Sequence, residues 1–129
     1  MPGWGTGSFE NEDAQNFLAK LNSLGIDDLS PILASAVDHN YLDAPASTIA
    51  IVVAEIVATA SGNPPQTVPA QIVEWIAKIE GSPSPQMADL ARRAVEKVRT
   101  NSELKDLWLE AEGLNEWSAV LRDLEKRLS

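Results

Sequence analysis

Hydrophobic residues recur along the chain at helical spacing, and the stretch 46–60 is apolar on nearly every side. On a helix that turns about 100° per residue, Thr48, Glu55 and Thr59 share one narrow stripe. A helix that is apolar nearly all round must be buried. A bilayer is excluded as the burying medium, because a span needs roughly 20 apolar residues and this stretch is shorter and carries a central Glu. The pattern therefore predicts a buried central helix.

Shorter amphipathic runs on both sides of this stretch predict the other helices. Segments rich in Gly, Pro, Ser and Asn separate them, and no run alternates as a strand would. We expect Ser30 and Asn115 to cap two of these helices and Asp43 to cap the central one. The first run continues from Asn11 to Gly25. The predicted fold is all-α: a single-domain, irregular bundle of about seven helices, made from residues 1–129 around the 46–60 helix.

The first ten residues break the helical pattern, because Trp4 and Phe9 flank Gly5 and Gly7. Glycine permits positive φ, so a tight loop can place both rings on the core. A phosphate-binding loop is the functional alternative, and Trp4, Gly5 and Gly7 would be its ligand contacts. No strand precedes this loop, no Lys follows at P-loop spacing, and the acids that follow would repel an anion. We expect residues 1–10 to form a loop that packs on the bundle.

The formal charge of −9 is unevenly distributed. Residues 1–77 hold one base, Lys20, against nine acids, for a net −8, whereas residues 78–129 hold nine bases against ten acids, for a net −1. Phosphate groups bind to clustered Lys and Arg, so neither nucleic acid nor an anionic membrane is an expected partner. Such a field attracts a basic protein or a divalent cation. The alternative is that the acids only maintain solubility. The candidate partner surface comprises Glu10, Glu12, Asp13, Asp27, Asp28 and Asp43.

Glu55 is the polar residue that most needs an explanation. An ionised carboxylate in an apolar helix is costly unless hydrogen bonds or a cation compensate for its lost hydration. We expect the N-terminal loop to supply the donor, through the Trp4 indole N–H or the backbone N–H groups of residues 5–8. The alternative function makes Glu55 a general acid or base in a pocket, in a hydrolase or in a small-molecule or metal-binding protein.

Other catalytic chemistry has little support in the sequence. The chain has no Cys and one histidine, His39, whereas a zinc site usually needs several His or Cys ligands. A nucleophilic triad would require His39 to orient a Ser that no elbow motif surrounds. We interpret His39 as the end of a helix, where it favours the dipole, and expect no cofactor, metal or catalytic residue. Without Cys and without the basic and apolar regions of a signal peptide, a cytoplasmic location is expected.

Three pieces of the chain together resemble a known family. They are Trp4–Ala14 with Phe17; Leu42–Pro45 running into Ala54–Ala58; and Asn101–Leu104 with Leu107, Trp108, Glu116 and Trp117. In this order they are similar to the bacterial family called domain of unknown function 4259. The resemblance implies an all-helical fold and a bacterial source. It implies no activity, cofactor or catalytic residue.

The function that these patterns favour is that of a non-enzymatic protein-interaction module. Its acidic N-terminal half would bind a basic protein, because complementary charge speeds association. An immunity-type or antitoxin-like inhibitor of a basic enzyme is one concrete form of this hypothesis. Two alternatives stay open: the ligand-binding or hydrolytic protein centred on Glu55, and a homo-oligomeric structural protein.

Overall fold

The computed structural model describes residues 5–129, which form seven α-helices and two short 3₁₀ turns. The α-helices are α1 (Glu12–Ala19), α2 (Leu29–Asp38), α3 (Ala44–Ala60), α4 (Ala70–Lys78), α5 (Pro85–Thr100), α6 (Glu103–Glu110) and α7 (Leu114–Arg127), and the turns are η1 (Leu21–Ser23) and η2 (Ile26–Asp28). No described residue lies in a β-strand, although an isolated bridge joins Leu42 to Ser102. The predicted all-α bundle is confirmed.

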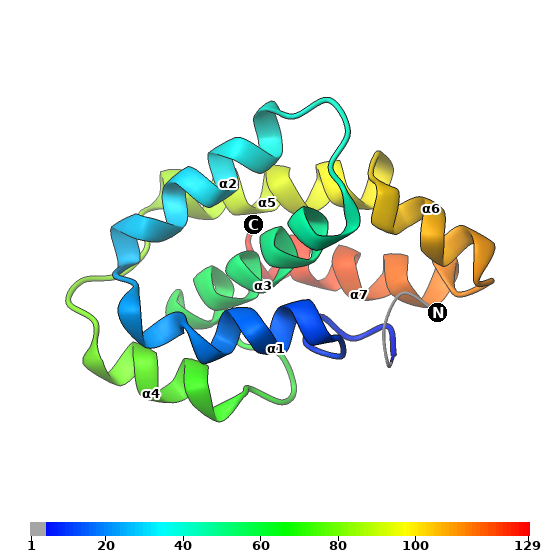
Figure 1. Ribbon diagram of the computed structural model, residues 1–129. Helices are drawn as coiled ribbons and strands as arrows, with labels where there is room; N and C mark the ends of the chain where they lie inside the picture. Colours follow the sequence, from blue (N-terminus) through cyan, green and yellow to red (C-terminus); the bar gives the residue numbers. More distant parts are fainter. Residues whose placement is uncertain (1–4) are drawn as a thin grey trace.

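Helix α3 occupies the middle of this bundle. Every residue from Ala50 to Ala58 is buried. In Figure 1, α3 lies between α2 above and α1 below, with α5 and α7 behind it; all four helices pack against it. The helix starts at Ala44 because the Asp43 carboxylate caps it, accepting the Ala46 N–H at 2.8 Å. The sequence therefore predicts the central helix and its cap correctly, and the structure extends it by two residues.

Two other helix starts differ from the prediction. Helix α2 begins one residue before Ser30, because η2 runs directly into it and the Leu29 N–H already donates to the Ile26 carbonyl. Helix α7 begins at Leu114, with Gly113 rather than Asn115 at its N-cap position. A Cβ on Gly113 would lie 2.6 Å from the Trp108 ring, so the close approach of α6 and α7 requires glycine there.

Helix α1 is also shorter than the apolar run predicts, since it ends at Ala19 and gives way to η1 and η2. The indole N–H of Trp75, on α4, donates to the Leu24 carbonyl at 2.7 Å. This bond holds the turn between α1 and α2 and places α4 beside it. A contact from a distant helix therefore fixes the turns that follow the first helix. No helix among residues 5–129 combines the length and apolar composition that crossing a bilayer requires.

The burial of α3 makes a direct stability prediction. Val52→Ala, at a fully buried position, should lower the free energy of unfolding by about 2 kcal/mol, since it removes two methyl groups at ~0.8 kcal/mol each and leaves a small cavity. The same change at Val73, whose side chain is 55% exposed on α4, should shift it by less than ~0.5 kcal/mol. Urea denaturation followed by circular dichroism measures both. Equal effects at the two positions would contradict the central place of α3.

Candidate functional site

Glu55 lies midway along α3 and is only 2% exposed, yet both of its carboxylate oxygens have donors. The Ser8 hydroxyl donates to Oε2 at 2.6 Å, and the Arg127 guanidinium donates to Oε1 at 2.8 Å. Ser8 belongs to the loop before α1, and Arg127 is the last residue of α7. One buried carboxylate therefore joins the beginning and the end of the fold to its central helix.

The predicted segment, the N-terminal loop, does supply a hydrogen-bond donor to Glu55. The donating group is not one of those predicted. The donor is the side-chain hydroxyl of Ser8, whereas the Gly7 N–H donates to Glu10. Trp4, the other expected donor, lies outside the described residues. Arg127 was missed because a base four residues after Asp123 in an amphipathic helix has the sequence pattern of a solvent-exposed ion pair. The only sign in the sequence that Glu55 needs such a partner is that this acid is predicted to be buried and has no base close to it in the sequence.

Arg127 is held on several sides. Its Nε donates to Asp123 at 2.8 Å, and its Nη1 also donates to the Asn63 carbonyl at 3.3 Å, in the connection after α3. Burial opposes its charge, but the hydrogen bond and the attraction of Glu55, with a smaller contribution from Asp123, outweigh that cost and raise the pKa of Arg127 above its ordinary value. The guanidinium is therefore a permanent counter-ion for Glu55.

The two glycines of the N-terminal loop make room for a carboxylate. The Gly7 N–H donates to Glu10 Oε1 at 3.1 Å, and a Cβ on Gly5 or Gly7 would collide with the Glu10 carboxylate where it lies. Gly7 does not have a positive φ, so the loop does not use left-handed backbone at that glycine. Phe9 packs against the core, as predicted. The acid that closes this loop leaves it unsuited to phosphate.

The space beneath the loop is too small for a metabolite. Its volume is about 10 Å³, roughly one water-sized sphere, between Thr6, Thr48, Trp108 and Trp117. An open groove of about 1040 Å³ lies on the other side of the loop and reaches Glu55 and Arg127. Its other walls include Phe9 and the turn after α3. Because Ser8 and Arg127 already occupy both oxygens of Glu55, these contacts support a structural role for the carboxylate.

The acids proposed as a partner surface are all exposed, but they lie on separate elements. Glu12 and Asp13 form the first turn of α1, where they complement the helix dipole. Asp28 accepts the Gly25 N–H at 2.7 Å beyond the other end of α1, and Asp43 caps α3. Glu10, Asp28 and Asp43 therefore also have local structural roles. Glu12, Asp13 and Asp27 accept no hydrogen bond from any described residue.

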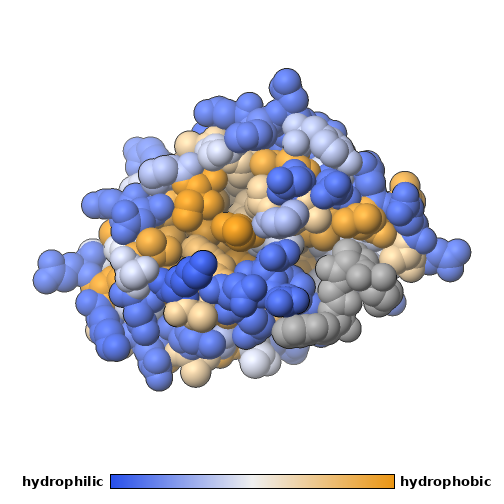
Figure 2. All heavy atoms as spheres, viewed as in Figure 1, coloured by the Kyte–Doolittle hydropathy of each residue, from blue (hydrophilic) through white to orange (hydrophobic). Residues whose placement is uncertain are grey.

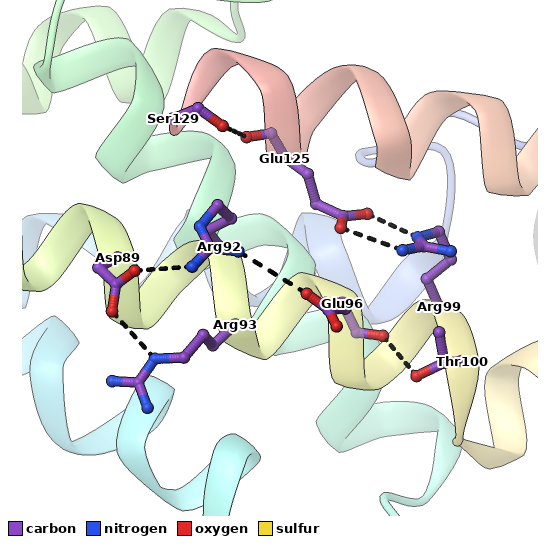
Figure 3. Close-up of polar contacts among 8 residues, drawn as sticks. All are labelled: Asp89, Arg92, Arg93, Glu96, Arg99, Thr100, Glu125 and Ser129. Atoms are coloured by element: carbon purple, nitrogen blue, oxygen red, sulfur yellow. Dashed lines mark hydrogen bonds and ion pairs between the residues drawn. The ribbon is translucent and has the colours of Figure 1, made fainter.

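The second half of the chain neutralises much of its own charge. Asp89 binds Arg92 at 2.8 Å and Arg93 at 3.0 Å along α5 (Figure 3). Arg99 reaches across to α7, where its Nε and Nη2 donate to the two oxygens of Glu125 at 2.6 and 3.2 Å. This bidentate pair fastens α5 to α7.

The connection from α2 to α3 is fastened to α6 by polar contacts. Glu103 donates its N–H to the Leu42 carbonyl at 2.9 Å, and its carboxylate accepts the Ala44 N–H at 2.7 Å. The Tyr41 hydroxyl donates to Asp106 at 2.5 Å, although the residue is 51% exposed. This hydrogen bond, with slight desolvation and the nearby carboxylates, raises the pKa of Tyr41 to about 12. His39 is the C-cap of α2, at the predicted end of that helix, and its Nδ1 lies 2.7 Å from the Ser35 carbonyl.

Removing one partner of the Glu55 ion pair should destabilise the fold. Arg127→Met leaves a buried carboxylate held only by Ser8, and should lower the free energy of unfolding by about 3 kcal/mol. The double variant Glu55→Met with Arg127→Met should lose less than the sum of the two single losses, because the charges then disappear together. Urea unfolding of all four proteins measures this coupling.

The matched control is Arg122→Met, an exposed position on the same helix, which should cost less than ~0.5 kcal/mol. A loss at Arg127 no greater than the loss at Arg122 would show that the buried pair contributes nothing to stability.

Tyr41 is the single tyrosine of the chain, so its ionisation can be followed directly by ultraviolet difference absorbance. Its pKa should be about 12 in the folded protein. Asp106→Ala removes the acceptor and the nearest negative charge, and should lower the pKa towards the ordinary value of about 10. Glu116→Ala, on the exposed side of α7, should leave it unchanged. Circular dichroism at each pH establishes that the chain is still folded; an unshifted wild-type pKa there would refute the Tyr41–Asp106 contact.

Comparisons with known proteins agree with the resemblance seen in the sequence. The model of the family described as domain of unknown function (DUF4259) matches residues 3–120 of the 129. No curated protein and no solved structure matches the chain. The match covers the N-terminal loop, α1 to α6 and the first half of α7. The chain therefore belongs to the DUF4259 family.

Proposed function

We propose that this protein is a non-enzymatic interaction module whose acidic N-terminal half binds a basic protein partner, in the cytoplasm. The observation that supports the proposal is that nearly all acids in residues 1–77 are exposed and form no ion pair with any described residue. Of the nine, only Glu55 forms an ion pair within the described part of the chain. The eight that are exposed and form none are Glu10, Glu12, Asp13, Asp27, Asp28, Asp38, Asp43 and Glu74.

This arrangement separates charge that stabilises the fold from charge that faces solvent. In residues 78–129, the numbers of bases and acids are nearly equal, and ion pairs on α5 and between α5 and α7 neutralise several of these side chains. In residues 1–77, Lys20 is the single base. The field over the first half is therefore negative across several elements, and such a field raises the association rate with a basic surface.

The contacts of Glu55 favour binding over catalysis as the main role of the protein. A general acid or base must reach the substrate proton at hydrogen-bond distance. Glu55 already accepts two short hydrogen bonds and has a permanent counter-ion. The open groove beside it is the one observation in favour of the alternative, a small-molecule-binding protein. That alternative would require Ser8 or Arg127 to leave the carboxylate.

The experiment is capture of partners from a lysate of the source organism, with the immobilised protein at low and high salt. The test variant carries Glu12→Gln, Asp13→Asn and Asp27→Asn, three acids that accept no hydrogen bond from the described residues. The control variant carries Glu110→Gln, Glu112→Gln and Glu116→Gln, which change the net charge by the same amount on the other half of the chain. All six positions are exposed, so both variants should fold.

A basic protein should bind the wild type and the control variant, and its purified form should associate with the test variant on the order of tenfold more slowly at low salt. Added salt should reduce the difference between the variants, because it screens exposed charges. Stopped-flow measurement of the association rate checks both effects. Equal loss in the two variants would contradict a directed acidic surface, and recovery of no basic protein at low salt would contradict the proposal as a whole.

A further inference from the structure

We infer that the groove between α2 and the first half of α3 is the docking site for an amphipathic helix that carries an apolar stripe flanked by Lys or Arg. The inference rests on the proposed function and gives the partner a place and a shape. Figure 2 shows apolar atoms gathered in a hollow on the face where α2 and α1 both lie against α3. The groove, with a volume of about 490 Å³, is lined on its apolar side by Pro31, Ile32, Ala36, Leu42, Ala46 and Ile49.

The groove has the shape that an added helix fits. Ile32 and Ala36 are four residues apart on α2, and Ala46 and Ile49 are three apart on α3, so each helix presents a short ridge. A helix packs by placing its own ridge in the channel between two such ridges. No described residue forms a strand whose edge could bind an extended peptide instead. The volume is enough for two or three apolar anchors, as in other helix-in-groove complexes.

The walls of the groove are held in place before any partner arrives. The connection that closes one end is tied to α6 through the Leu42 carbonyl, the Ala44 N–H and the Tyr41 hydroxyl. Opposite it, Ala36 is buried against the core, whereas Ile32, Ala46 and Ile49 stay partly open to solvent. A preorganised apolar surface loses little entropy on binding, which favours affinity.

Charge at the groove selects the occupant. Asp43 is the one carboxylate in its lining, which also contains His39 but no Lys or Arg. Asp38 is the exposed last residue of α2. The Tyr41 hydroxyl at the rim is turned to Asp106, another acid. A helix with acidic flanks would be repelled along this rim, whereas one with Lys or Arg beside its apolar stripe would be attracted. The chemistry of the groove therefore matches the basic partner that the acidic half of the chain attracts.

The test uses a fluorescent, acetylated peptide of about 18 residues, long enough to form a helix on the groove. Leu residues occupy one helical stripe and Lys residues the remaining positions; a matched peptide has Glu in place of Lys. Fluorescence anisotropy at low salt should show binding of the Lys peptide to the wild type and none of the Glu peptide. Ala46→Arg and Ile32→Arg, which fill the groove and reverse its charge, should each weaken binding at least about tenfold.

Val73→Arg is the control, since it adds the same charge at an exposed apolar position on α4 and should change affinity by less than about twofold. Circular dichroism establishes that each variant is folded. The groove assignment is overturned if the Lys peptide fails to bind the wild type, if it binds all variants equally, or if the Glu peptide binds as well. It is also overturned if sedimentation shows a wild-type dimer that Ala46→Arg dissociates, because the occupant would then be a second copy of the chain.

The two groove variants keep all eight exposed acids, which separates this inference from the proposed function. If a basic protein captured from the lysate binds Ala46→Arg as tightly as the wild type, the acidic surface stands and the groove assignment fails. If the lysate yields no basic protein while the Lys peptide binds the groove, the groove stands as a cationic-helix site and the proposed cellular function fails.

Discussion

The buried ion pair between Glu55 and Arg127 is the constraint on which the arrangement of this fold depends. Helix α3 is apolar enough to be enclosed on all sides, and its one carboxylate must then be neutralised from within the protein. The Ser8 hydroxyl reaches it from one end of the described chain and Arg127 from the other. The last turn of α7 is held to α3 by this ion pair, in addition to the Arg99–Glu125 pair that fastens α7 to α5. The N-terminal loop is anchored at the same point.

A consequence of this pairing is that charge has two distinct uses in the molecule. Arg99 with Glu125, and Arg127 with Glu55, tie helices together where the side chains are largely removed from solvent. Such partly enclosed, hydrogen-bonded pairs are stronger than exposed ones. Apart from Glu55, the acids of the first half form no such ties, and several act only as local caps. Their net charge therefore faces solvent, and the apolar groove between α2 and α3 lies within the same half of the chain.

The groove and the central helix have a common origin. Helix α2 packs on α3 without covering its first half completely. Ala46 and Ile49 therefore stay partly exposed. The connection after α2 could have covered this surface, but its hydrogen bonds to α6 hold it at the edge instead. The surface is thus apolar because it borders the core and open because the connection is held elsewhere. That combination is typical of interaction sites in helical proteins.

Local patterns in the sequence determined the helices, the burial of α3, the cap at Asp43 and the need of Glu55 for a donor, because periodicity and capping depend on residues a few positions apart. Only the tertiary structure decided which donors meet Glu55, since Arg127 is 72 residues away and resembles an ordinary surface base in its own helix. The tertiary structure also brought the Trp75 indole to the Leu24 carbonyl between α1 and α2, and placed the Trp108 ring against Gly113 at the start of α7. Contacts between residues far apart in sequence depend on how whole helices pack, and no local spacing encodes that packing.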